Sequence, residues 1–115
     1  MRVLLSIERR HSAYGEALAE AIGALRLRLE VSLASPEEFE QELARLGPEL
    51  VVCGRPEPVG FSGALAWVEL LVDTDRPTKV RVGGHRREVI NLSFIELLGV
   101  VDEAWALARP MPVVA

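Results

Sequence analysis

The chain has little of the chemistry that builds metal centres and disulfides. Its 115 residues include one cysteine, two histidines and one lysine. The single cysteine, Cys53, excludes a disulfide within the chain. Cys53 with only His11 and His85 to join it is too small a set for a zinc cluster. We therefore expect no metal and no cofactor, and we expect Cys53 to pack as a small apolar side chain.

The chain also lacks a long apolar run and an excess of positive charge. No run reaches the roughly 18 apolar residues of a membrane-spanning helix, and Met1 leads into a strand-like segment without the charged start of a signal peptide. With 17 acidic and 13 basic residues the net charge is −4, so nothing recommends nucleic acid or an anionic membrane as a partner. We expect one cytoplasmic domain over residues 1–115, in which residues 110–115 form a flexible tail.

Apolar runs in the first half of the chain have the length of strands. Residues 2–7 are too few for a helix, and residues 48–53 are entered at a proline and left at a glycine. Both runs are typical of strands buried on both faces, which usually belong to a parallel sheet. Residues 29–34 alternate weakly, and this pattern predicts a further strand at or near a sheet edge.

Two helices are predicted between these strands. Residues 13–28 follow Ser12, a suitable capping residue, and carry apolar side chains three and four positions apart. The predicted buried face of this helix comprises Tyr14, Leu18, Ala21, Ile22, Leu25 and Leu29. Ser35 followed by Pro36 and by Glu38 is a capping box with proline at the first helical position. It predicts a second helix that begins at Pro36 and stops at Gly47.

The second half departs from this alternation. Proline and glycine recur within residues 57–63, which predicts a loop rather than a third full helix. Residues 67–72 fit either a strand or the end of a short helix that starts near Ser62, because so apolar a run has no decisive period. We interpret them as a strand, because residues 79–82 alternate polar and apolar as an antiparallel partner would.

The end of the chain is predicted to hold one more strand and a helix. Gly83-Gly84 is a tight-turn signal, after which residues 87–90 fit a strand. Ser93 and Glu96 form a second capping box, which predicts a helix over residues 94–109. The predicted buried face of this helix comprises Phe94, Leu98, Val101, Trp105 and Ala108.

These elements together predict an α/β fold. Strands and helices that alternate through short connections imply right-handed crossovers and parallel pairing. We expect a three-layer sandwich whose three parallel strands lie in the order second, first, third, with helices on both faces. A C-terminal hairpin or meander and the final helix are expected to extend this sheet.

The sequence of residues 47–56 resembles the third strand of the receiver domains of two-component response regulators. In that family a Pro-Asp-Leu-Val-Leu-Leu-Asp run is followed by Met-Pro and a glycine. The resemblance covers about the first 63 residues and implies a flavodoxin-like, receiver-like fold. The position that matches the family's phosphate-accepting Asp is Gly54, and the acidic pair that holds Mg²⁺ is matched by Ile7 and Glu8. Mg²⁺ needs oxygen ligands and phosphoryl transfer needs a nucleophile. The resemblance therefore implies a divergent relative that cannot accept a phosphoryl group.

Independently of that resemblance, ligands of open α/β sheets bind outside the carboxyl ends of the parallel strands. The residues predicted at this edge are Arg9, Arg10, His11, Ser12, Gly54 and Arg55. Three arginines and a histidine near a helix N-terminus are a candidate site for a small anion or a nucleotide. The alternative is that the arginines are solvated and pair with Glu8, Glu57 and Asp73. The predicted hairpin turn near His85 falls at the opposite edge and is not expected to cooperate with them.

No arrangement of nucleophile and base can be assembled from the sequence, so we expect no enzyme. The predicted last helix, in contrast, has more apolar residues than one buried face needs. The surplus at Ile95, Val100 and Leu107 suggests contact with a protein partner, foremost a second copy, and the hairpin edge could serve the same purpose. We therefore predict a non-enzymatic regulatory or protein-interaction module, with binding of a small anion or nucleotide as the alternative.

Overall fold

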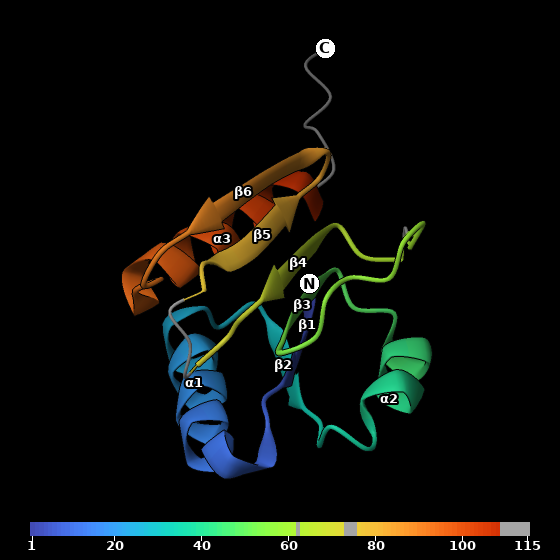
Figure 1. Cartoon of the computed structure of the whole chain (residues 1–115), viewed down its shortest axis with the longest axis vertical. Coiled ribbons are helices and arrows are strands. Elements are labelled where there is room, and N and C mark those ends of the chain that lie inside the picture. Colours follow the sequence, from blue (N-terminus) through green and yellow to red (C-terminus); the bar gives the residue numbers. More distant parts are fainter. Residues whose placement is uncertain (62, 73–75, 109–115) are drawn as a thin grey trace.

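The computed structural model describes residues 1–61, 63–72 and 76–108 (Figure 1). In chain order its elements are β1 (Arg2–Ser6), the 3₁₀ turn η1 (Arg9–His11), α1 (Ser12–Leu25), β2 (Glu30–Leu33), α2 (Phe39–Leu46), β3 (Leu50–Cys53), β4 (Ala66–Glu69), β5 (Thr78–Val82), β6 (His85–Val89) and α3 (Phe94–Ala108). The fold is α/β, as predicted. Residues 62, 73–75 and 109–115 lie outside the described residues, and with them the predicted tail at 110–115.

The six strands form one mixed sheet in the order β2-β1-β3-β4-β5-β6. The predicted order of the first three strands and their parallel pairing are confirmed. β4 adds a fourth parallel strand beside β3, and its Val68 lies opposite Val52 of β3. The predicted antiparallel pairing of β4 with β5 is also confirmed, and β6 pairs antiparallel with β5 through the Gly83-Gly84 turn.

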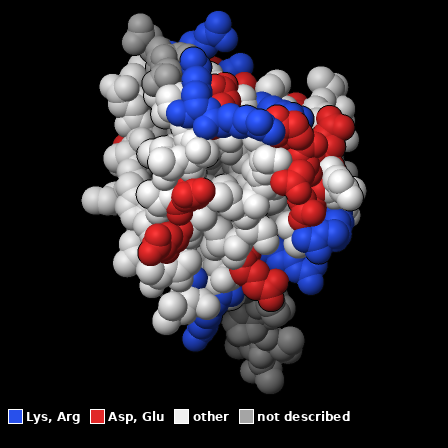
Figure 2. Space-filling model, turned by 90° about the horizontal axis from the view of Figure 1, so that it is seen from below, with Lys and Arg blue, Asp and Glu red and all other residues white. Residues whose placement is uncertain are grey.

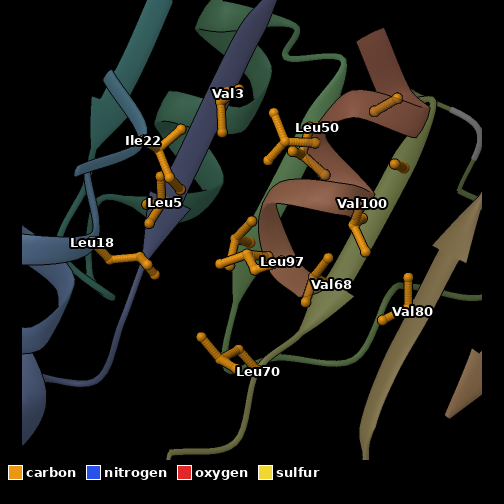
Figure 3. Close-up of a cluster of buried hydrophobic side chains, with 14 of the residues drawn as sticks. Val3, Leu5, Leu18, Ile22, Leu50, Val68, Leu70, Val80, Leu97 and Val100 are labelled. Carbon is orange, nitrogen blue, oxygen red and sulfur yellow. The ribbon is translucent and has the colours of Figure 1, made fainter. Parts of the chain in front are cut away.

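Helices cover the two faces of the sheet unequally. α1 and α3 pack on one face, where Ile22 and Val100 meet alternate side chains of β1, β3, β4 and β5 (Figure 3). α2 packs on the other face through Phe39, against Val51 and Trp67. Successive strand side chains point to opposite faces, so these central strands must be apolar throughout.

The starts and ends of the first two helices correct the predictions. α1 begins at Ser12 itself, with His11 in the capping position and no side-chain cap, and it ends at Leu25. Tyr14 and Leu25 are exposed, and the buried positions are Gly15, Leu18 and Ile22. α2 begins at Phe39, one turn after Pro36.

The predicted capping box before α2 does not form. The Ser35 hydroxyl donates to the Glu38 carboxylate at 2.8 Å, so the two side chains bond each other rather than the backbone N–H groups. The end of the helix is as predicted, because Gly47 adopts φ +54 and donates its N–H to the carbonyl of Leu43.

The capping box of α3 forms as predicted, but the buried face of the helix differs. The Glu96 N–H donates to Ser93 Oγ and the Ser93 N–H donates to Glu96 Oε1, both at 3.1 Å. The fully buried residues of α3 are Leu97, Val100, Val101 and Ala104, whereas Phe94, Leu98, Trp105 and Ala108 are only half-buried. The predicted buried face was therefore wrong except at Val101, because periodicity cannot fix how a helix with apolar residues on most sides is rotated about its axis.

The described residues of the β3–β4 connection, 54–61 and 63–65, form no helix, in agreement with the predicted loop. The Trp67 indole N–H donates to the Arg55 carbonyl at 3.0 Å, and Trp67 packs edge-on against Phe39 and Phe61. Trp67 is buried in the core on this face of the sheet. This loop and α2 cover the centre of the sheet, so no helix among the described residues covers β5 and β6 on that face (Figure 1).

Candidate functional site

The predicted anion-binding residues lie at one edge of the sheet, but acidic neighbours already engage their arginines. Arg9 and Arg10 belong to the 3₁₀ turn that precedes α1. Arg9 Nη2 lies 3.0 Å from Glu37 Oε1, and Arg10 Nε lies 2.9 Å from Glu8 Oε2. The pKa of Glu37 is lowered, first by a hydrogen bond from its own backbone N–H and then by Arg9. The predicted pairing with Glu8 is thus found for Arg10, while Arg9 pairs with a residue that the sequence did not indicate.

Arg55 is held by the segment that leads into α2. It donates to the Pro36 carbonyl at 2.6 Å and lies over the ring of Phe39, 5.1 Å from its centroid. Arg55 Nη1 is 3.8 Å from Glu40, whereas Glu57, which we expected to pair with the edge arginines, lies elsewhere. Gly54 lies beside Glu8 and the carbonyl of Leu70. The Arg55 guanidinium therefore packs on α2 instead of extending freely into solvent.

A crevice of about 210 Å³ nevertheless opens beside the start of α1. It is lined by Arg9 and Ser12 on one side and by Leu33, Ser35 and Pro36 on the other. Figure 2 views the molecule from the end at which α1 begins in Figure 1. On this face basic and acidic side chains lie next to one another around a broad uncharged area, with no continuous basic surface. The crevice thus offers one arginine and hydroxyl groups to a small anion, although the carboxylate of Glu16 also lines it.

The candidate interface residues of α3 differ in exposure. Ile95 is 80% exposed and Leu107 is 51% exposed, as contact with a partner requires. Val100 is 1% exposed and packs in the core, so its predicted place on the surface is wrong. Ile90, just after β6, is 72% exposed and adds to the apolar surface at the start of α3. The sequence analysis did not name Ile90 as an interface residue, because Ile90 is the last residue of a predicted strand.

A second feature that the sequence did not reveal lies on the uncovered face of the hairpin. Arg81 and Glu57 form a bidentate ion pair, with bonds of 2.7 and 2.6 Å, in which the side chains are 14% and 9% exposed. Arg81 also donates to the carbonyls of Ala64, Leu65 and Gly83. The pair ties the β3–β4 loop to β5 and forms one wall of a groove of about 270 Å³.

Charged side chains lie along the floor of this groove. Glu69 of β4, Lys79 of β5 and Glu88 of β6 lie opposite one another in register on its floor, so negative, positive and negative groups follow across three strands. Arg86 lies 3.9 Å from Glu57 at its side. Exposed charges of alternating sign stabilise a solvated sheet face, so this arrangement accounts for the groove without a ligand.

The described residues offer few groups with altered reactivity. Burial raises the pKa of Cys53 to about 11, and the Arg55 backbone and charge oppose this only in part, so the thiol stays protonated at neutral pH. Within the described ranges, no three His, Cys, Asp or Glu side chains gather as metal ligands would. None of the described helices is long and apolar enough to cross a membrane.

Comparison with known proteins gave no match to a protein-family model, a curated protein or a solved structure.

Proposed function

We propose that the chain is a non-enzymatic regulatory or protein-interaction module, a divergent receiver-like domain that self-associates through the start of α3. The observation that carries this proposal is the exposure of Ile90 and Ile95, both above 70%. Ser93 and Glu96 lie near these two isoleucines in the sequence, and their capping box fixes the backbone at the start of α3. The exposed apolar side chains are therefore presented on a fixed backbone. Burying apolar surface is favourable by about 25 cal/mol per Å².

The residues at the receiver-like positions support a role without phosphoryl transfer. Gly54 follows β3 where that family has its acceptor, and Ile7, which follows β1, is buried and apolar. Neither side chain can bind Mg²⁺ or attack phosphorus. A module of this kind would act through its contacts with proteins.

The first experiment compares Ile95→Glu with wild type by sedimentation over a wide range of concentration. We expect wild type to gain mass as concentration rises, and Ile95→Glu to lose the part of that gain which the α3 contact provides. Ala106→Glu is the matched control, since Ala106 is also exposed on α3 but lies eleven residues further along. Equal masses for Ile95→Glu and wild type at every concentration would contradict the proposal.

The crevice beside α1 supports the alternative, a site for a small anion. Arg9 and Ser12 line it, and the Arg9–Glu37 ion pair is exposed and therefore weak, so an anion could displace Glu37. The test is a titration with inorganic phosphate followed by amide NMR. Saturable shifts at residues 9–12 that Arg9→Gln abolishes would favour this function, whereas unchanged spectra would rule it out for phosphate.

A further inference from the structure

The two outer strands of the sheet are protected to different degrees. An outer strand exposes unpaired N–H and C=O groups, and charged side chains are a common way to prevent other chains from pairing there. β6 carries His85, Arg86, Arg87 and Glu88 and is protected in this way. β2 has no charge at Val31, Ser32 and Leu33, and Leu33 is 46% exposed. The β2 edge is therefore open to a further strand.

The backbone of β2 defines what that strand must look like. The N–H groups of Glu30 and Ala34 donate inward to the carbonyls of Met1 and Leu5, each at 2.9 Å. Since the direction of these groups alternates along a parallel strand, the N–H and C=O groups of Val31 and Leu33 point away from β1. Two residues that are separated by one position thus present two donors and two acceptors.

We propose that two copies of the chain pair antiparallel through β2, with Ser32 at the two-fold axis. In this register Val31 of each copy lies opposite Leu33 of the other, and the outward N–H and C=O groups of both residues are satisfied by four hydrogen bonds. The pairing is self-complementary and closed, as a two-fold contact requires. It joins the two sheets into one.

The elements around β2 fit such a pairing. α1 packs against β2 and β1, so the two α1 helices would lie next to each other on the same face of the joined sheet. Beyond the strand, the antiparallel order brings the end of β2 that carries Arg28 toward the end that carries Glu37 and Glu38 in the other copy. All three residues are exposed, so opposite charges meet.

This contact goes beyond the proposed function and is separate from the surface at Ile90 and Ile95. β2 is at the outer edge of the parallel strands, whereas α3 follows β6 at the opposite edge of the sheet. With both contacts the chain would form assemblies larger than a dimer. Each contact has its own variant, so the failure of one proposal does not affect the other.

The direct test places a cysteine on the axis. In antiparallel pairs, opposite residues without mutual hydrogen bonds have Cα atoms about 4.5 Å apart, within the range that a disulfide spans. Under mild oxidation we expect Ser32→Cys to yield a covalent dimer as its main product. Glu88→Cys on the protected edge is the matched control and should stay monomeric. Cys53 is buried with a raised pKa and should not compete.

Leu33→Lys tests the same contact without cross-linking, because it places a charge at an exposed position on the open β2 edge. We expect it to abolish the β2 contact, so that Leu33→Lys combined with Ile95→Glu sediments as a monomer, whereas Ile95→Glu alone retains a concentration-dependent dimer. Circular dichroism checks that each variant is folded. Cross-linking of Ser32→Cys no faster than that of Glu88→Cys, or an unchanged mass for Leu33→Lys, would overturn the proposal.

Discussion

The parallel and antiparallel halves of the sheet are built on different principles. β1 and β3 are buried on both faces between helices, whereas β5 alternates buried and partly exposed residues and β6 is almost wholly exposed. The difference follows from the β3–β4 connection, whose described residues form no helix. Where a helix is missing, the Arg81–Glu57 ion pair fixes the loop instead. The parallel half is thus packed with apolar side chains on both faces, whereas the hairpin has apolar packing on the α3 face and the partly buried Arg81–Glu57 contact on the other.

The strongest test of this contrast removes that contact. Arg81→Ala removes the bidentate partner of Glu57, which keeps only the more distant Arg86, and it leaves the Ala64 carbonyl without its donor. The Leu65 carbonyl still accepts from the Gly83 N–H. The pair is only partly buried, so we expect this loss of hydrogen bonds to lower the unfolding free energy by about 1–3 kcal/mol. Urea denaturation measures the loss.

Arg86→Ala is the control for Arg81→Ala, since Arg86 also approaches Glu57 but is exposed. We expect it to change the unfolding free energy by less than about 0.5 kcal/mol. Similar losses for the two variants would show that Arg81 is not special and would remove the distinction between the two halves.

A pair of glycines compares the halves at equal chemistry. Gly47 at the end of α2 and Gly83 in the hairpin turn have φ +54 and +57. Alanine in this left-handed region costs about 1–2 kcal/mol, so both Gly→Ala variants should lose that amount in thermal or urea unfolding. Gly99→Ala in α3 meets open space and should instead gain about 0.5–1 kcal/mol. A loss at Gly99 would mean that α3 is more tightly enclosed than described.

Two isoleucines allow the buried core beneath α1 to be compared with the proposed contact surface on α3. Ile22→Val removes one buried methylene beneath α1 and should cost about 0.5–1.5 kcal/mol. Ile95→Val should leave the unfolding free energy of the monomer unchanged, because Ile95 is exposed. If Ile95→Val destabilises as much as Ile22→Val at low concentration, Ile95 is part of the core.

The smallest expected effect concerns the ion pair that joins α1 to α3. Hydrogen bonds from Arg26 at 2.7 and 2.9 Å lower the pKa of Asp102 below its unfolded value. The pair therefore stabilises the fold above the unfolded pKa, and this contribution is lost as pH falls through the folded pKa. Asp102→Asn should be slightly less stable than wild type at neutral pH. The gap should close in acid, and a gap that widened in acid would contradict this sign.

The parts of the fold that the sequence predicted are those in which local pattern and burial agree. The uniform apolar run at 50–53 and the alternation at 79–82 each have one reasonable structural interpretation. The start of α2 was misplaced because Ser35 and Glu38 bond each other, a choice between side chains that spacing cannot decide. The rotation of α3 about its own axis was not predicted, because apolar residues lie on every side of that helix.

The candidate site was predicted less completely than the fold. The edge that carries Arg9 and Arg55 follows from strand direction, but their partners Glu37 and Glu40 come from α2 and the turn before it. The pairing of Arg81 with Glu57 spans 24 residues and depends on a loop path that no local signal encodes. Contacts between irregular segments are set by tertiary packing, so they had to come from the structure.

The central claim, a protein-interaction module that associates through the start of α3, is tested most directly by amide NMR of labelled protein at low and high concentration. The account predicts signals at residues 90–98 that broaden or shift as concentration rises and that do so no longer in Ile95→Glu. Inorganic phosphate added to the same sample should leave the spectrum unchanged. Signals at 90–98 that ignore concentration, together with saturable phosphate shifts at residues 9–12, would contradict the claim and favour the anion site.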